Sequence, residues 1–271
     1  MKKYLVIGNP IDHSLSPKLH NYWIKKNNLD AIYDKRQLDE NNIEEIINDL
    51  KKGKIDGINV TVPFKKTVIP FLDKLTPLVK KTHSVNTIFK EGHKVVGDNT
   101  DVEGFELSLK YIDYSIKNKK VFVLGAGGVA PSIILALKRL GASEIILSNR
   151  TKKNAEYLKK EYPNLKVIDW GQTTDFDMII NATSLGLKNS DQINIDYNKF
   201  GTGKLFYDVI YSPSKTNFLL KAKESGNQIE NGKLMFIYQA QLGFKILHNI
   251  LPKVDKSVIN LLDIWLEFAF W

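Results

Sequence analysis

The sequence predicts an α/β protein of two domains, one of them built on a doubly wound parallel sheet. Strand-like and helix-like segments alternate along most of the 271 residues, which is typical of parallel β-α-β units. A glycine-rich run, Gly125–Ala130, follows a fully apolar strand and opens a helix. The chain is also long enough for two domains of ordinary size.

The first third of the chain predicts strands and helices in turn. Tyr4–Gly8 is a short apolar strand, and Ser16 is expected as the N-cap of a helix with Pro17 at its first position. That helix is expected to end near Asn28. Apolar spacing then predicts a strand over Ala31–Leu38, a helix over Asn42–Lys52, a strand over Ile55–Val60, and a hairpin of Val85–Phe89 with Lys94–Val96.

After Asp101 a helix carrying Phe105 and Leu109 is expected to connect the two domains. Buried-type strands then alternate with helices: strands over Val121–Leu124, Glu144–Ser148, Asp177–Asn181 and Leu205–Ile210, and helices ending at Leu140 and covering Lys152–Tyr162. Two helices follow from Leu234 onward. The last, over Val258–Trp271, has an amphipathic pattern that favours covering a core over docking on a membrane.

The composition indicates a folded protein of a reducing compartment. The absence of cysteine excludes disulfides and thiolate metal sites. The apolar start is interrupted at Asn9-Pro10, too early for a signal peptide, and no apolar run is long enough to span a membrane. We therefore expect a cytoplasmic protein without a membrane segment.

The net charge is +9, but the lysines occur as scattered pairs and no nucleic-acid motif accompanies them. A solvated surface is the favoured interpretation, and a nucleic-acid partner is not expected. The positive field still favours anionic small molecules. The five histidines do not cluster with carboxylates at ligand spacing, so no metal site is predicted.

Two short runs, Asn59–Lys65 and Gly97–Asp101, each end in an ionisable residue just past a strand. Loops at strand ends are where a rigid scaffold places functional side chains. A Lys and an Asp brought together there can act as a proton-handling pair. Taken singly, Lys65 could equally be a surface lysine and Asp101 a helix cap.

The residues Gly125, Gly127 and Ala130 match the dinucleotide-binding pattern, with a strand before and a helix after. The next strand ends in Asn149-Arg150-Thr151, where an NAD enzyme usually carries an acid. An arginine suits the 2′-phosphate of NADP instead. The alternatives are a merely tight turn and a surface arginine. A bound hydride carrier and a proton-handling pair of Lys65 and Asp101 would together make an alcohol/ketone redox enzyme, which is the class that the sequence indicates.

A series of segments, in order and at suitable spacing, matches one family: Gly8–Pro17, Asn59–Lys65, Asn86-Thr87, Gly97–Asp101, Gly125–Gly128, Asn149–Thr151, Asn181–Ser184, Tyr211–Pro213 and Gln239-Ala240. Over essentially its whole length the chain resembles the shikimate dehydrogenases. The resemblance implies NADPH-dependent, reversible reduction of 3-dehydroshikimate to shikimate, on the chorismate pathway to aromatic amino acids. It also implies a substrate-binding and catalytic domain over residues 1–100, an NADP-binding Rossmann domain over 101–233, and C-terminal helices over 234–271 that return to the first domain.

The resemblance further implies a catalytic pair of Lys65 and Asp101. The ammonium would stabilise charge on the reacting oxygen, and which of the two transfers the proton stays open. The remaining implied substrate-binding residues are Ser14 and Ser16 for the carboxylate, Asn59, Thr61, Asn86 and Gln239 for the ring hydroxyls, and Tyr211 near the nicotinamide. Alternatively, Ser16 only caps a helix and the Asn and Thr side chains bond local backbone.

The implied cofactor site comprises Gly125, Ala126, Gly127, Gly128, Val129, Ala130, Asn149, Arg150, Thr151, Lys152, Thr183, Ser184 and Gly232. The chain departs from the family at Asn154, where a second basic residue is common, so the strictness of NADP selectivity stays open. The competing hypotheses are a quinate/shikimate dehydrogenase of broader specificity and a non-catalytic NADP-binding regulator. Monomer and homodimer both remain open.

Overall fold

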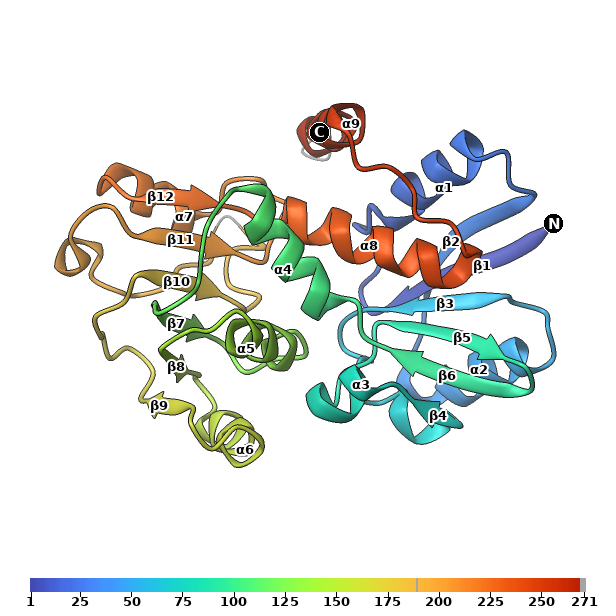
Figure 1. Cartoon of the computed structure of the whole chain (residues 1–271), viewed down its shortest axis with the longest axis horizontal. Coiled ribbons are helices and arrows are strands. Elements are labelled where there is room, and N and C mark those ends of the chain that lie inside the picture. Colours follow the sequence, from blue (N-terminus) through green and yellow to red (C-terminus); the bar gives the residue numbers. More distant parts are fainter. Residues whose placement is uncertain (189, 269–271) are drawn as a thin grey trace. The chain divides into compact units, whose positions relative to one another are not determined.

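The computed structural model describes residues 1–188 and 190–268 of the chain. The chain forms two compact units (Figure 1). The first unit comprises Met1–Gly104 and Ile237–Trp271, and the second comprises Phe105–Phe236. Both boundaries fall inside helices, one in α4 (Asp101–Tyr111) and one in α8 (Lys233–His248). The C-terminal helices thus belong to the same unit as the first hundred residues.

The first unit contains a mixed sheet with the strand order β2-β1-β3-β5-β6-β4. β1 runs parallel to β2 and β3, and β5 is antiparallel to both β3 and β6. The predicted hairpin is therefore confirmed. The strands are β1 (Lys2–Gly8), β2 (Ala31–Gln37), β3 (Gly57–Val60), β4 (Lys74–Leu75), β5 (Thr87–Glu91) and β6 (Lys94–Asp98).

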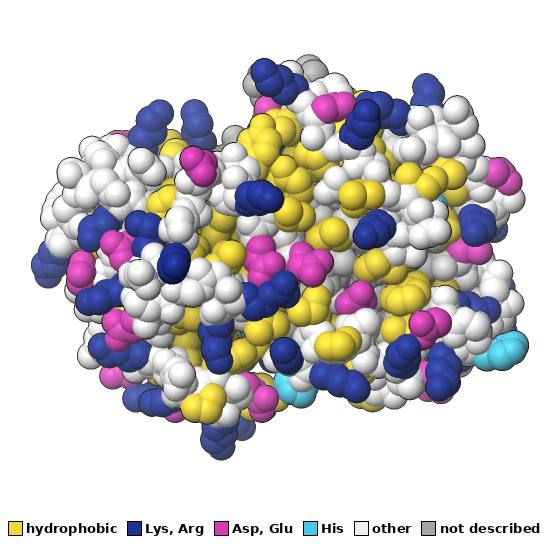
Figure 2. Space-filling model, viewed as in Figure 1, with side chains coloured by type: hydrophobic (Ala, Val, Ile, Leu, Met, Phe, Trp, Pro, Cys, Tyr) yellow, Lys and Arg dark blue, Asp and Glu magenta, His cyan; other side chains and the backbone are white. Residues whose placement is uncertain are grey.

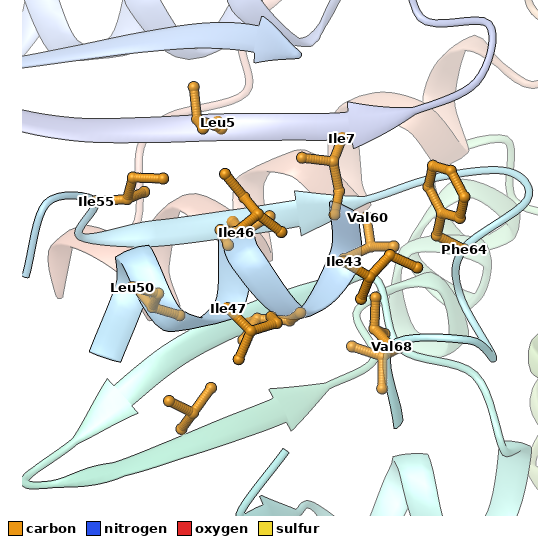
Figure 3. Close-up of a cluster of buried hydrophobic side chains, with 14 of the residues drawn as sticks. Leu5, Ile7, Ile43, Ile46, Ile47, Leu50, Ile55, Val60, Phe64 and Val68 are labelled. Atoms are coloured by element: carbon orange, nitrogen blue, oxygen red, sulfur yellow. The ribbon is translucent and has the colours of Figure 1, made fainter. Parts of the chain in front are cut away.

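Helix α2 (Ile43–Lys51) supplies much of the core of this unit (Figure 3). Its Ile43, Ile46, Ile47 and Leu50 recur at helical spacing and are all buried in the hydrophobic cluster that also holds residues of the sheet. Burying each such side chain contributes roughly 1.5–3 kcal/mol. This packing fixes the sheet whose strand ends carry Lys65 and Asn86.

The prediction that Ser16 is the N-cap of α1 (Ser16–Lys26) is wrong. Leu15 is the N-cap, with φ −84° and ψ −2°, and Ser16 is already helical. The reason is local: the Ser14 hydroxyl oxygen accepts the Ser16 N–H at 3.3 Å, so the chain turns into the helix one residue early. Pro17 is therefore the second residue of the helix and not, as was predicted, the first, although it still lies in the first turn.

The second unit contains a fully parallel sheet with the order β12-β11-β10-β7-β8-β9. The chain runs outward from β7 and then returns to place β10 on the other side of β7. The carboxyl ends of β7 and β10 therefore form the topological switch point, where ligands bind in sheets of this kind. The strands are β7 (Lys120–Leu124), β8 (Glu144–Ser148), β9 (Lys166–Ile168), β10 (Met178–Asn181), β11 (Leu205–Asp208) and β12 (Gln228–Glu230).

Several short elements are absent from the sequence-based prediction. They are α3 (Pro77–Thr82), β4, β9, α7 (Asn217–Glu224) and β12, which are too short for a clear periodic signal. The longer helices α5 (Ala130–Arg139) and α6 (Lys152–Glu161) agree with the prediction to within a few residues.

The last helix, α9 (Lys256–Phe268), buries Val258 and Leu262 one turn apart and exposes Asp263. The predicted helix extended to Trp271; residues 269–271, and the side chains from 264 on (Glu267 included), lie outside the described residues. Within the described part of the chain, no helix combines the length and apolarity needed to cross a membrane.

Candidate active site

Lys65 and Asp101 form a buried ion pair. Lys65 lies in the loop after β3, and Asp101 is the first residue of α4. The Lys65 ammonium donates to Asp101 Oδ2 at 2.6 Å, and the two residues are 9% and 4% exposed. Two residues that are 36 positions apart in the sequence thus meet in one charged pair.

Asn86 connects this pair to its surroundings. Its side-chain amide donates to Asp101 Oδ1 at 2.9 Å and to Thr100 Oγ1 at 2.9 Å. It also approaches Gln239 Oε1 on α8 at 3.3 Å. A Cβ at Gly104 would lie 2.7 Å from the Cβ of Gln239, so α4 and α8 approach closely here only because position 104 is glycine. The structure therefore brings Lys65, Asp101, Asn86 and Gln239 together in one hydrogen-bonded group.

Asn59 lies next to this group, but its side chain is occupied by the protein. The Tyr33 hydroxyl donates to Asn59 Oδ1 at 2.7 Å. The Asn59 amide donates to the Asn86 carbonyl at 3.1 Å and to Thr87 Oγ1 at 3.0 Å. Asn59 thus holds the start of β5 in place. Thr61, two residues on, is half-buried.

Ser14 and Ser16 form a separate pair at the N-terminus of α1. Both side chains are half-buried, and the bond between them is the one that starts the helix. No acidic residue occurs in the first turn of α1. A helix N-terminus with two hydroxyls and no acid favours an anionic group.

The glycine loop of the second unit follows β7 at the switch point. Gly125 has φ +105°, and a Cβ there would lie 2.9 Å from the Ala182 carbonyl oxygen, so only glycine fits. At Gly127 the space is open, since a Cβ would meet only that same oxygen, at 4.0 Å. The first turn of α5 carries no acidic residue and no side-chain cap. Open space beside a helix N-terminus suits the pyrophosphate of a dinucleotide.

The end of β8 is tied to the glycine loop through Asn149. Its Oδ1 accepts the Ala126 N–H at 2.9 Å, and its amide donates to the Thr151 carbonyl at 2.8 Å. Arg150 is exposed beside it. Lys152 is exposed as well and forms an ion pair with Asp169 at 2.9 Å. Arg150 and Lys152 are therefore presented to solvent at the carboxyl end of the sheet, but Lys152 shares its charge with a carboxylate.

A polar network joins the ends of β10 and β11. Asn181 Oδ1 accepts the Thr183 N–H at 3.0 Å and the Thr183 hydroxyl at 2.7 Å, while the Asn181 amide donates to Asp208 at 3.0 Å. Burial raises the pKa of Asp208 to about 6, although hydrogen bonds from Thr216, the Ile210 N–H and Asn181 oppose the rise. Thr183 is half-buried; its neighbour Ser184 is exposed.

Gly232 packs directly against the loop after β11. A Cβ there would lie 2.0 Å from the Val209 carbonyl oxygen, and the Gly232 N–H donates to the Ile210 carbonyl at 3.0 Å. The Tyr211 ring stacks on Phe236, with ring centroids 4.5 Å apart. Gly232 thus sets the position of the loop that carries Tyr211.

Three residues that contribute to the site were not singled out from the sequence: Asn99, whose Oδ1 accepts the Asp101 N–H at 2.9 Å, Gly104 and Asp208. Asn99 lies in the run Gly97–Asp101, and an Asn just before a helix is a recognisable N-cap signal. Asp208 could have been recognised as well, because it is an ionisable residue at the end of an apolar strand. Gly104 had no such signal, because a close approach between helices is a tertiary property.

Chemically, the first unit presents a buried ammonium–carboxylate pair surrounded by amides, a setting suited to proton transfer at a hydroxyl or carbonyl oxygen. The second unit presents a dinucleotide-type loop. Among the described residues no group of three or more His, Cys, Asp or Glu side chains is arranged to hold a metal. Figure 2 shows Lys and Arg side chains spread over the visible face.

Comparison with known proteins covers nearly the whole chain. Residues 6–88 match the family described as the shikimate dehydrogenase substrate binding domain, and residues 106–188 match the one described as shikimate / quinate 5-dehydrogenase. A shikimate dehydrogenase (NADP(+)) from Pelagibacter ubique is 58% identical, over 97% of this chain and 99% of that protein.

Solved structures agree. The crystal structure of shikimate dehydrogenase from Aquifex aeolicus is 36% identical with a TM-score of 0.87, and the match covers 95% of this chain and 96% of that one. A shikimate 5-dehydrogenase from Thermus thermophilus, in complex with NADP(H) and shikimate, is 28% identical with a TM-score of 0.87, over 95% and 97% of the two chains. With both family models and a full-length relative in agreement, the chain belongs to the shikimate dehydrogenase family.

Proposed function

We propose that this protein catalyses the NADPH-dependent, reversible reduction of 3-dehydroshikimate to shikimate. The observation that carries the proposal is the buried Lys65–Asp101 pair, at 2.6 Å, in a chain that matches a shikimate dehydrogenase (NADP(+)) over nearly its whole length. A catalytically idle regulator would not require this pair to be kept buried and hydrogen-bonded.

The pair suits ketone reduction. When bound, NADPH supplies the hydride for the carbonyl carbon. The Lys65 ammonium stabilises the negative charge that grows on the carbonyl oxygen and holds the proton that this oxygen takes up. Asp101 orients Lys65 through its Oδ2, and Asn86 holds the other oxygen of the same carboxylate. Water is kept from the pair by its burial.

The substrate is held by the first unit in this proposal. Ser14 and Ser16 bind its carboxylate at the N-terminus of α1, and Thr61, Asn86 and Gln239 bind its ring hydroxyls. Asn59 contributes mainly by fixing the start of β5, because its side chain already makes three hydrogen bonds to the protein. Tyr211 is assigned to the nicotinamide side of the reaction.

The cofactor is assigned to the second unit. Backbone groups of Gly125–Ala130 bind the pyrophosphate, while Arg150, Thr151 and Lys152 face the 2′-phosphate. Asn149 supports both loops through its two hydrogen bonds. Thr183, Ser184 and Gly232 complete the nicotinamide side. The absence of cysteine and the use of NADPH fit a cytoplasmic location.

The proposal is tested by following NADPH oxidation with 3-dehydroshikimate, alongside NADH and, in the reverse direction, quinate. We expect turnover with NADPH and 3-dehydroshikimate and at least about ten-fold lower kcat/KM with NADH. Comparable rates with quinate and shikimate would favour the broader quinate/shikimate activity. No turnover with any pair would refute the enzyme assignment. Sedimentation of the same sample distinguishes monomer from homodimer.

A further inference from the structure

We propose that Asn99 is a positioning residue that sets the separation of Lys65 and Asp101 through the backbone. The inference rests on the proposed function, since it assigns the catalytic pair to these two side chains. Asn99 is 1% exposed, so its carboxamide is committed to the protein on all sides.

The acceptor side of Asn99 holds Asp101. Asn99 Oδ1 accepts the Asp101 N–H at 2.9 Å and approaches the Val102 N–H at 3.3 Å. It therefore caps the first turn of α4, the turn on which the catalytic carboxylate is carried. Asp101 cannot shift along or away from the helix start without breaking this cap.

The donor side of Asn99 reaches the other loop. Its side-chain amide donates to the Ser84 carbonyl at 2.8 Å. The same peptide group, through the Val85 N–H, donates to the Lys65 carbonyl at 2.8 Å. One peptide plane, Ser84–Val85, is thus bonded on one side to the loop of Asp101 and on the other to the backbone of Lys65.

This connection is independent of the ion pair itself. The Lys65 side chain is long and flexible, so the salt bridge alone does not fix where the ammonium lies when a substrate oxygen competes for it. A backbone relay keeps the two attachment points at a constant distance throughout the reaction. A misplacement of about 1 Å in a reacting group can cost about 10²-fold in rate.

The acceptor and donor roles can be separated by substitution. Asn99→Asp keeps the side-chain shape and the helix cap but loses the donor to Ser84, and Asn99→Ser keeps a capping oxygen on a shorter side chain. Asn227→Asp is the matched control. Asn227 is 7% exposed, accepts the Lys204 N–H at 3.0 Å and donates to the Gly201 carbonyl at 3.1 Å, and it belongs to the second unit.

Two measurements test the proposal: kcat with NADPH and 3-dehydroshikimate, and the rate at which Lys65 is acylated by an amine-reactive reagent, followed by peptide mass spectrometry. For Asn99→Asp and Asn99→Ser we expect kcat to fall about 10–100-fold, with KM for NADPH within about two-fold of wild type. Lys65 should be acylated several-fold faster, because its partner is held less firmly. Asn227→Asp should change neither quantity, whatever it does to the melting temperature.

The acylation measurement does not depend on catalysis. If wild type lacks turnover, the proposed function fails, yet acylation of Lys65 still reports whether Asn99 restrains it. If Lys65 is acylated at the wild-type rate in both folded Asn99 variants, or if kcat stays within about two-fold of wild type, the positioning role of Asn99 is overturned. Should Asn99→Ser fail to fold, Asn99→Asp, which retains the cap, supplies the result.

Discussion

Lys65 Nζ lies 2.6 Å from Asp101 Oδ2, in surroundings where both residues are more than nine-tenths buried. Removing one member of a buried pair leaves the other charge without its counter-ion, at a cost of about 3–5 kcal/mol. We therefore expect Lys65→Met to lower kcat by about 10²–10⁴-fold and to lower the free energy of unfolding as well. Steady-state kinetics and urea unfolding at neutral pH measure the two effects.

The matched control is Lys74→Met. Lys74 forms an ion pair of nearly the same length with Glu91, at 2.5 Å, but the two side chains are 50% and 58% exposed. Exposed pairs contribute about 0–1 kcal/mol, so this substitution should leave kcat unchanged and stability nearly so. Equal effects of the two substitutions would contradict a special role for the Lys65–Asp101 pair.

Substitution by alanine should have very different effects on stability at two glycines of the second unit. A Cβ at Gly232 would lie 2.0 Å from the Val209 carbonyl oxygen, whereas at Gly127 it would meet nothing nearer than 4.0 Å. Gly232→Ala must shift the backbone, so we expect a loss of at least about 1–3 kcal/mol of stability. Gly127→Ala should fold almost as well as wild type.

At Gly127 the expected effect of alanine is on NADPH binding and not on stability. If pyrophosphate approaches the backbone at Gly127, a methyl group there blocks it, and the Kd for NADPH should rise at least about ten-fold at nearly unchanged melting temperature. Fluorescence titration of NADPH and a thermal melt of each variant provide the comparison. Unimpaired NADPH binding by a folded Gly127→Ala protein would place the cofactor elsewhere.

Features of this protein with a local sequence pattern can be predicted from the sequence, whereas features that depend on tertiary contacts cannot. The sequence predicts strand β8 with its observed limits because the apolar run is bounded by clear breaks, and it marks Lys65 and Asp101 as candidates because each follows a short strand. The role of Asn99 was not predicted. It depends on the Ser84 carbonyl accepting the Asn99 amide and on the Val85 N–H donating to the Lys65 carbonyl, and such contacts between separate loops leave no local pattern. The same holds for Gly104 and for the close packing of Gly232 against Val209.

His20 should make stability depend on pH. It is fully buried, its ring stacks on Tyr33 with centroids 4.0 Å apart, and its Nδ1 has no hydrogen-bond partner. Burial, with a smaller effect of His248, lowers its pKa from 6.5 to about 3. The unfolded chain therefore binds the proton first, so the stability is present above pH 6.5 and is lost as the pH falls toward 3.

Between about pH 7.5 and pH 5 the free energy of unfolding that is lost through His20 is about 2 kcal/mol. Asp208 acts in the opposite direction, because its folded-state pKa is raised from 3.8 to about 6, so variants must be compared with wild type at each pH. We expect His20→Phe to reduce the dependence in urea unfolding but not to abolish it, because burial also lowers the pKa of His248, to about 4. The exposed His93 supplies the control, His93→Asn, which should leave it unchanged. A wild-type slope in the folded His20→Phe protein would contradict this account.

Cofactor preference should depend on the charges that follow β8 and β9. Arg150 is exposed at the end of β8, and Lys152 is paired with Asp169 at 2.9 Å while Asn154 supplies no charge. If these groups bind the 2′-phosphate, Arg150→Gln should lower kcat/KM for NADPH about 10–100-fold and leave the value for NADH nearly unchanged.

Asp169→Asn should have the opposite effect. It removes a carboxylate close to the proposed phosphate position and releases Lys152, so we expect kcat/KM for NADPH to rise a few-fold, most clearly at low ionic strength. Asp175→Asn is the matched control, since Asp175 is likewise an exposed aspartate paired with a lysine, Lys204, at 3.3 Å. A ratio of NADPH to NADH activity that is unaffected by both Arg150→Gln and Asp169→Asn would exclude this end of the sheet as the 2′-phosphate site.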